Sequence, residues 1–176
     1  MGSGKSALNS AEWMPQRIDL QVASMNALNR NIRQLQLQAN LVGSAWQGKV
    51  QAQELAGDFN YQPAKGTESA LIMARLSHLN VPENTTTDRD PWLDSGTPDY
   101  PTLDVLVQEL EVRGKKLGLL ELKAKNQIRS DGSREWNLNH LAIQNEDAVF
   151  SAQGRWQKTP AAPRGQTQMD FKLTVK

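Results

Sequence analysis

The chain opens with the sequence "MGSGKS", whose last three residues match the end of a phosphate-binding P-loop. A complete P-loop reads G-x-x-x-x-G-K-[ST], lies between a strand and a helix, and binds phosphates through backbone N–H groups. Here the first glycine of the motif would have to precede Met1, and the residues up to Glu12 lack the pattern of the required helix. We therefore expect no nucleotide site and interpret residues 1–12 as a flexible leader.

The side chains that most often perform catalysis do not gather in one part of the sequence. The two histidines, His78 and His140, are far apart, and the absence of cysteine excludes thiolate metal sites and cysteine nucleophiles. Glu109 and Glu111 share one face of a predicted strand and could form an acid–base pair. Nearby Lys and Arg residues make an exposed, charged strand face the simpler interpretation. We expect neither an enzyme nor a bound metal or cofactor.

The charge balance gives no sign of a nucleic-acid partner. The chain has 20 Lys and Arg residues against 19 Asp and Glu residues, so its net charge is +1. Such a chain creates no strong field for attracting DNA or RNA, and charges that alternate in sign are typical of a solvated face. No apolar run approaches the roughly 20 residues of a membrane-spanning helix.

Apolar residues alternate with polar ones over most of the chain. This period of two puts one face of a strand in a dry environment and the other in water, which is typical of antiparallel sheets. A helix would instead scatter Leu35, Leu37 and Leu41 around its circumference. The sequence therefore predicts strands, and the clearest alternation lies at residues 18–22, 35–39 and 169–175.

The predicted fold is all-β, a long antiparallel meander of about ten strands. Turn signals at residues 29–31, 42–44, 113–115 and 130–132 separate the strands. Residues 81–100, rich in Pro, Thr and Asp, break the alternation and are interpreted as a linker or an excursion. The expected strands are residues 17–28, 31–42, 45–55, 56–62, 69–79, 102–113, 116–127, 134–144, 147–157 and 167–175.

An internal repeat accompanies the alternation. A shift of 85 residues lays residues 18–40 on residues 103–125 without a gap, so that Asp19 meets Asp104. Further along, Trp46 corresponds to Trp136, and a related apolar-Asp-apolar motif returns at residues 169–173. We expect a first β unit at residues 13–80 and a second at 101–176 that includes the start of a third. Such units stack by their edges into an elongated structure.

Several segments resemble a known family. The segment "YPTLDVLVQELEVRGKKLGLLELKAKNQ", followed by "REWNLNHLAIQNEDAVFSAQGRWQ", resembles the C-terminal part of the YhdP branch of the AsmA-like family of Gram-negative envelope proteins. The segment "WMPQRIDLQVASMNALNRNIRQLQLQANLVGSAWQGKVQAQELAGDFNYQP" resembles the preceding unit, and "ESALIMARLSHLNVPE" resembles its fifth strand. The resemblance covers the chain from about Trp13 onward, except for residues 84–99.

The resemblance implies a long periplasmic protein that an N-terminal helix anchors in the inner membrane. Its body would be a β-sheet folded lengthwise into an open, β-taco-like groove that moves phospholipids towards the outer membrane. This chain lacks the helix and most of the body, so we expect a fragment. Its partners would be phospholipid acyl chains and neighbouring repeat units, with membrane contact only through segments of the parent chain. The alternative is a β-sheet scaffold or interaction module of the envelope that pairs through its sheet edges.

The alternating apolar residues are the candidate groove lining. Each CH₂ group of an acyl chain removed from water contributes about 0.8 kcal/mol, so an apolar trough needs no specific polar contact to hold a lipid tail. The other interpretation is that these residues form a closed core, and that Trp46, Trp136 and Trp156 pack on the sheet rather than at the rim. The candidate lining residues are Ile18, Leu20, Val22, Leu35, Leu37, Ala39, Leu103, Val105, Val107, Leu120, Leu122, Ala124, Met169, Phe171 and Leu173.

Overall fold

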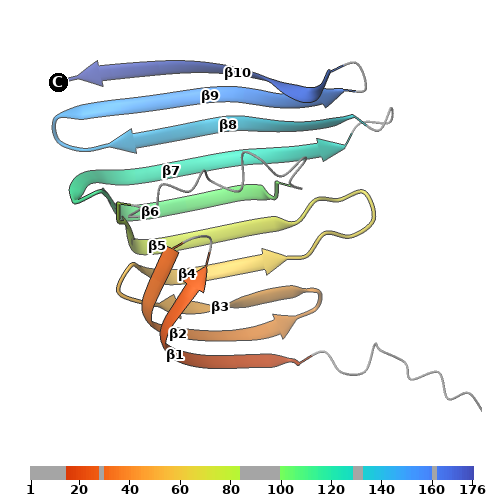
Figure 1. Ribbon diagram of the computed structural model, residues 1–176, viewed down its shortest axis with the longest axis vertical. Coiled ribbons are helices and arrows are strands. Elements are labelled where there is room, and N and C mark those ends of the chain that lie inside the picture. Colours follow the sequence, from red (N-terminus) through yellow and green to blue (C-terminus); the bar gives the residue numbers. More distant parts are fainter. Residues whose placement is uncertain (1–14, 28–29, 84–99, 129–132, 160–161) are drawn as a thin grey trace, which may run out of the picture.

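The computed structural model describes residues 15–27, 30–83, 100–128, 133–159 and 162–176, and ten strands among them form one open sheet (Figure 1). Neighbouring strands follow chain order, with β1 and β10 at the two edges. The predicted all-β fold of ten strands is confirmed. The strands are β1 (Arg17–Ala27), β2 (Arg30–Val42), β3 (Ala45–Gln51), β4 (Leu55–Gln62), β5 (Leu71–Val81), β6 (Thr102–Val112), β7 (Lys115–Ile128), β8 (Arg134–Gln144), β9 (Ala148–Thr159) and β10 (Ala162–Val175).

One pair departs from the predicted antiparallel meander. Strands β5 and β6 run parallel, with Leu71 opposite Thr102 and Val81 opposite Val112. Parallel neighbours need a connection that returns to the end of the sheet where the first strand began. The chain between Val81 and Thr102 makes this return, which the alternation alone did not predict. Residues 84–99 of the predicted linker, like the predicted leader at residues 1–12, lie outside the described residues.

Two predicted turns, at residues 42–44 and 113–115, lie where the sequence predicted them. The turn predicted at residues 29–31 does not, because Arg30 and Asn31 belong to strand β2 and pair with β1. Arg113 and Gly114 join β6 to β7, and both have positive φ angles of 52° and 74°. Two consecutive positive φ values define the type I′ turn that fits the twist of a β-hairpin. Gly43, with φ of 63°, lies in the turn between β2 and β3. The turn predicted at residues 130–132 lies outside the described residues.

The two hairpins aligned by the repeat share one register. Ile18 faces Ala39 in the first hairpin, and the equivalent residues Leu103 and Ala124 face each other in the second. The agreement ends near the second turn, where an irregularity in β6 follows Val107. Strand β10 pairs antiparallel with β9, just as β5 pairs antiparallel with β4. The motif at residues 169–173 therefore lies in the fifth strand of the second set of five strands, β6 to β10. The unit boundaries at 13–80 and 101–176 remain predictions.

Buried apolar side chains gather in two packed clusters. Val107 is 0 % exposed and packs with Leu76 and Leu110, which connects β5 to β6. A second cluster joins β7, β8 and β9 through Ala124, Leu138 and Ala152. Burial thus follows the strands with a neighbour on each side. Among the described residues, no helix is long and apolar enough to cross a lipid bilayer.

The β1–β2 hairpin extends beyond the end of β3, and Figure 1 shows its far end turning away from the direction of the other strands. Pairing of β2 with β3 stops at Gln36 opposite Gln51. Gln34 has a positive φ of 52°, an uncommon conformation for a residue other than glycine, and it lies where the hairpin leaves the sheet. Beyond this point β2 pairs in the ladder with β1 alone, so contacts of the hairpin with the rest of the sheet must come from outside the ladder.

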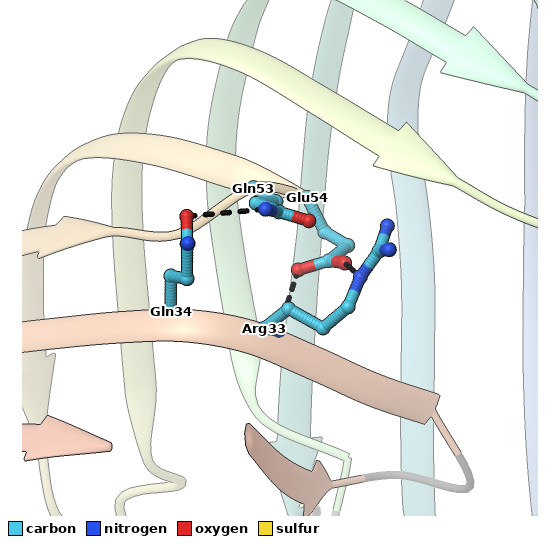
Figure 2. Close-up of polar contacts among 4 residues, drawn as sticks. All are labelled: Arg33, Gln34, Gln53 and Glu54. Carbon is cyan, nitrogen blue, oxygen red and sulfur yellow. Dashed lines mark hydrogen bonds and ion pairs between the residues drawn. The ribbon is translucent and has the colours of Figure 1, made fainter. Parts of the chain in front are cut away.

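A carboxylate in the β3–β4 turn supplies those contacts (Figure 2). The backbone N–H of Arg33 donates to Glu54 Oε2 at 2.8 Å, and the Arg33 Nε donates to Glu54 Oε1 at 2.9 Å. Beside them, Gln53 Nε2 donates to Gln34 Oε1 at 3.1 Å. Burial raises the pKa of Glu54, but the hydrogen bonds from Arg33 outweigh it and hold the pKa below its ordinary value. We call this contact the Arg33–Glu54 clamp.

Candidate functional site

Apolar residues of neighbouring strands lie directly opposite one another, which builds rows across the sheet. Residues paired in this way have their side chains on the same face, because side chains alternate between faces along each strand. The first row, row A, crosses all ten strands and contains apolar residues and one glycine. Row A consists of Leu20, Leu37, Val50, Gly57, Leu76, Val107, Leu120, Ile143, Phe150 and Leu173.

A second row, row B, lies two residues further along the strands and therefore on the same face. It also crosses all ten strands without a polar side chain. Row B consists of Ile18, Ala39, Gly48, Phe59, Ala74, Val105, Leu122, Leu141, Ala152 and Phe171.

A third row, row C, continues this face from β2 to β10. Rows A, B and C together define a single apolar face along the full width of the sheet, which we call the apolar face. Row C consists of Leu41, Trp46, Tyr61, Ile72, Leu103, Ala124, Leu138, Gly154 and Met169.

The structure places all fifteen candidate lining residues on the apolar face. Thirteen belong to the three rows, and the other two, Val22 and Leu35, face each other next to row A. Val107 and Ala124 in mid-sheet and Ala39 on β2 are buried, whereas Phe171 and Leu173 on the edge strand are each 65 % exposed. The interpretation that these residues form a core thus fits the buried side chains of the face, whereas the side chains on strand β10 are exposed to solvent. Contact of any of these residues with lipid remains a prediction.

Sequence reasoning missed much of the apolar face on β3, β4, β5, β8 and β9. The same alternation would have identified Val50, Phe59 and Leu141, but they lie in strands without a counterpart in the gapless repeat. Leu110 was missed for another reason. The irregularity between Val107 and Leu110 puts two residues between apolar side chains instead of one, so Leu110 is buried where strict alternation would place Glu109.

An aromatic cluster covers the row C end of the apolar face near β8 and β9. The ring centroid of Tyr100 lies 5.8 Å from that of Trp136 and 5.9 Å from that of Trp156. Trp136 Nε1 donates to the Pro101 carbonyl at 3.1 Å, and the Asn126 side-chain amide donates to the Tyr100 carbonyl. The residues just before β6 are thereby fixed on this face. Trp136 and Trp156 pack on the sheet, as one of the two interpretations of these residues predicted.

The opposite face is polar and charged. Arg75 and Asp104 form an ion pair across β5 and β6 at 3.0 Å, and His140 Nε2 lies 3.5 Å from Glu121 Oε2. One shallow depression of about 580 Å³ on this face is bordered by Gln38, Lys49 and other polar residues. Within the described part of the chain, no group of three or more potential metal ligands comes together. The two faces of the sheet thus differ sharply in chemistry.

Comparison with known proteins gives one family. No curated protein and no solved structure matches the chain. The sequence profile of the family described as YhdP protein, a family of envelope proteins of a transport or structural kind, matches residues 2–176. Because the match covers nearly the whole sequence, the chain belongs to the YhdP family.

Proposed function

We propose that the apolar face holds phospholipid acyl chains, and that the chain is part of a bridge-like lipid-transport protein of the periplasm. The observation that supports this most is the continuity of rows A and B, which cross all ten strands without a polar side chain. At the β10 end of these rows, Phe171 and Leu173 are each 65 % exposed. A large exposed apolar surface marks a site of interaction.

The direction of the rows suits a lipid path. Strands in a sheet lie about 4.8 Å apart, so ten strands extend each row over about 43 Å. The long axis of the molecule runs across the strands, in the direction of the rows (Figure 1). The hydrocarbon core of a bilayer is about 30 Å thick, which gives about 15 Å for the acyl chains of one leaflet. Each row is therefore more than twice as long as one lipid tail.

The chemistry of the face favours tails over headgroups. Each CH₂ group that leaves water on the apolar face contributes about 0.8 kcal/mol, without any need for a directional contact. Because rows A and B offer only apolar side chains or glycine at each step, a tail shifted along a row by one strand stays in an apolar environment. Uniform binding of this kind permits movement along the sheet. The headgroup would remain at the open side, in water.

Membership of the YhdP family, a family of envelope proteins, supports a larger setting for the proposal. We propose that the chain lies in the periplasm between the inner and outer membranes and that other segments of its parent anchor it to the inner membrane. Neighbouring repeat units would continue the apolar rows towards each membrane. The sheet described here would then supply one stretch of a longer path.

The experiment is lipid recovery from the purified chain. Native mass spectrometry and solvent extraction should recover phospholipid from the wild-type chain. Leu122→Gln, which places an amide in row B, should lower the recovered amount, whereas Lys123→Gln on the opposite face should not. Absence of lipid in the wild-type chain, or equal losses in the two variants, would contradict the proposal.

A further inference from the structure

A fourth row, row D, lies two residues beyond row C, at the end of the sheet where β8 begins and β9 ends. It consists of Asn126, Trp136, Trp156 and Thr167 on the adjacent strands β7 to β10. Two residues along a strand return to the same face, so row D belongs to the face that carries rows A to C. Its side chains combine aromatic rings with polar groups. The apolar face therefore changes its chemistry at row D.

Two hydrogen-bond donors at row D remain available. The ring of Tyr100 lies against those of Trp136 and Trp156, and Trp136 Nε1 already donates to the Pro101 carbonyl. The Tyr100 hydroxyl and Trp156 Nε1 donate to no group within the described part of the chain. Both residues are half-buried and neither donor is enclosed, so the two donors reach solvent. Tyr and Trp side chains suit places where one end is apolar and the other is wet.

Basic residues follow at the next register position beyond row D. Arg134 pairs with Ile128 on β7 and with Lys158 on β9. Along β8 the residues on this face therefore change from apolar at Leu138, through aromatic at Trp136, to cationic at Arg134. The same order occurs at a lipid–water interface, where Trp and Tyr lie at the level of the headgroups and basic residues contact phosphate.

The apolar rows together are about as wide as one acyl tail is long. Rows A and C are four residues apart along the strands, which corresponds to about 13 Å. The tails of one bilayer leaflet extend over about 15 Å. A tail parallel to the strands would extend from row C to row A and leave its glycerol end at row D. This orientation also leaves the lipid free to move sideways along the rows.

We propose that Tyr100 and Trp156 bind the glycerol–phosphate part of a phospholipid whose tails lie on rows A to C. This inference rests on the proposed function and adds to it a preference for lipids with a phosphate, together with the end of the strands where the headgroup lies. The hydroxyl and the indole N–H would donate to phosphate or ester oxygens, and hydrogen bonds to an ionised acceptor are the stronger kind. Arg134 adds positive charge but already has a partner within the chain, so the two neutral donors provide the preference.

The opposite end of the β8–β9 hairpin fits a phosphate less well. Its turn carries Glu146 and Asp147, which are both exposed. Asn145 Oδ1 accepts hydrogen bonds from the backbone N–H groups of Asp147 and Ala148, at 3.0 and 2.8 Å, which fixes the turn. Lys176 Nζ donates to the Asn145 carbonyl at 3.2 Å, so one cation accompanies two carboxylates there. Like charges repel, so a phosphate should prefer the row D end of this hairpin.

The first test compares two lipids that differ only in the headgroup. Native mass spectrometry of the full chain would measure binding of phosphatidylglycerol and of diacylglycerol with the same acyl chains. The wild-type chain should bind phosphatidylglycerol at least about ten-fold more tightly, because diacylglycerol lacks the charged acceptor. The double variant Tyr100→Phe/Trp156→Phe keeps an aromatic ring at each position but neither donor. It should lower this preference about ten-fold and leave diacylglycerol binding unchanged.

The matched control is Trp46→Phe, which removes an indole from row C on β3 and should keep the preference. Equal binding of the two lipids by the wild-type chain, or an unchanged preference in the double variant, would overturn the headgroup site and leave the proposed function intact. Binding of neither lipid would contradict both.

The second test locates the headgroup with photo-reactive amino acids on β10. Thr167 in row D and Leu173 in row A are both exposed. After irradiation with phosphatidylglycerol, fragmentation in the mass spectrometer would show which part of the lipid is attached. We expect attachment through the headgroup or glycerol at residue 167 and through an acyl chain at residue 173. Acyl attachment at both residues, headgroup attachment at residue 173, or no attachment at residue 167 would refute this orientation.

Discussion

The Arg33–Glu54 clamp makes the β1–β2 hairpin sensitive to one carboxylate. Glu54 is 7 % exposed and accepts hydrogen bonds from the Arg33 backbone and guanidinium. A hydrogen bond to a charged group contributes about 1.5–3 kcal/mol. The guanidinium is largely exposed, so its ion pair contributes only about 0–1 kcal/mol. Glu54→Ala should therefore lower the free energy of unfolding by about 2 kcal/mol, and Glu54→Gln, which keeps one neutral acceptor, by about 1 kcal/mol.

The contribution of Glu54 should also depend on pH. Its pKa in the folded chain lies below the ordinary value of 4.5, because the Arg33 hydrogen bonds outweigh the effect of burial. A carboxylate with a lowered folded pKa stabilises the fold above its unfolded pKa, and this stability disappears as the pH falls through the folded value. The difference between wild type and Glu54→Gln should be greatest at neutral pH and shrink as the pH falls below about 4.5.

The assay is urea-induced unfolding of the full chain at neutral and acidic pH. Glu68→Gln removes an exposed carboxylate in the β4–β5 loop and is the matched control, with an expected change below about 0.5 kcal/mol. Hydrogen exchange should show faster exchange of the Arg33 amide in Glu54→Ala, because its acceptor is gone. If Glu54→Gln and Glu68→Gln were equally stable, or if the difference did not change with acid, the clamp would not have the role assigned to it.

Two further substitutions test the fold. Val107 is fully buried, so Val107→Ala should lower the free energy of unfolding, measured in urea, by about 2 kcal/mol. Val42 is 55 % exposed, so Val42→Ala should lower it by less than about 0.5 kcal/mol. Equal effects of the two substitutions would mean that the centre of the sheet is not a packed core. Gly118→Ala should lower the midpoint of thermal unfolding more than Gly66→Ala. Both glycines have positive φ, but only at Gly118 would the added Cβ meet a backbone carbonyl oxygen, at 2.3 Å. A larger loss for Gly66→Ala would contradict the close approach of Gly118 in β7 to the backbone at Gln144, the end of β8.

The strand pattern was predictable because the sheet has one apolar face. Alternation alone locates most strands within a few residues, since a shift by one residue would turn Leu35 and Leu37 to the polar side. The repeat also predicts that the β6–β7 hairpin copies the register of β1–β2, as Leu103 opposite Ala124 shows. Local signals of this kind suffice for antiparallel hairpins, whose strands are joined by short turns.

Features that depend on distant contacts were not predictable. The parallel pairing of β5 with β6 follows from where the chain returns after Val81, and no periodicity encodes that path. The bulge that buries Leu110 needs the neighbouring strand for its definition. The role of Glu54 required knowledge that Arg33, 21 residues earlier in the sequence, lies beside it. Turn residues with a polar side chain are too common for the sequence alone to indicate such a clamp.

The central claim is that acyl chains lie on one face of this sheet and not on the other. Photo-reactive amino acids placed one at a time at Leu37 and Leu122 on the apolar face, and at their neighbours Gln38 and Lys123 on the polar face, test it most directly. After irradiation in cells or with phospholipid vesicles, mass spectrometry of the chain would identify attached lipid. The account predicts phospholipid adducts at Leu37 and Leu122 and none at Gln38 or Lys123. Equal labelling of both faces, or no adduct at Leu37 and Leu122, would contradict it.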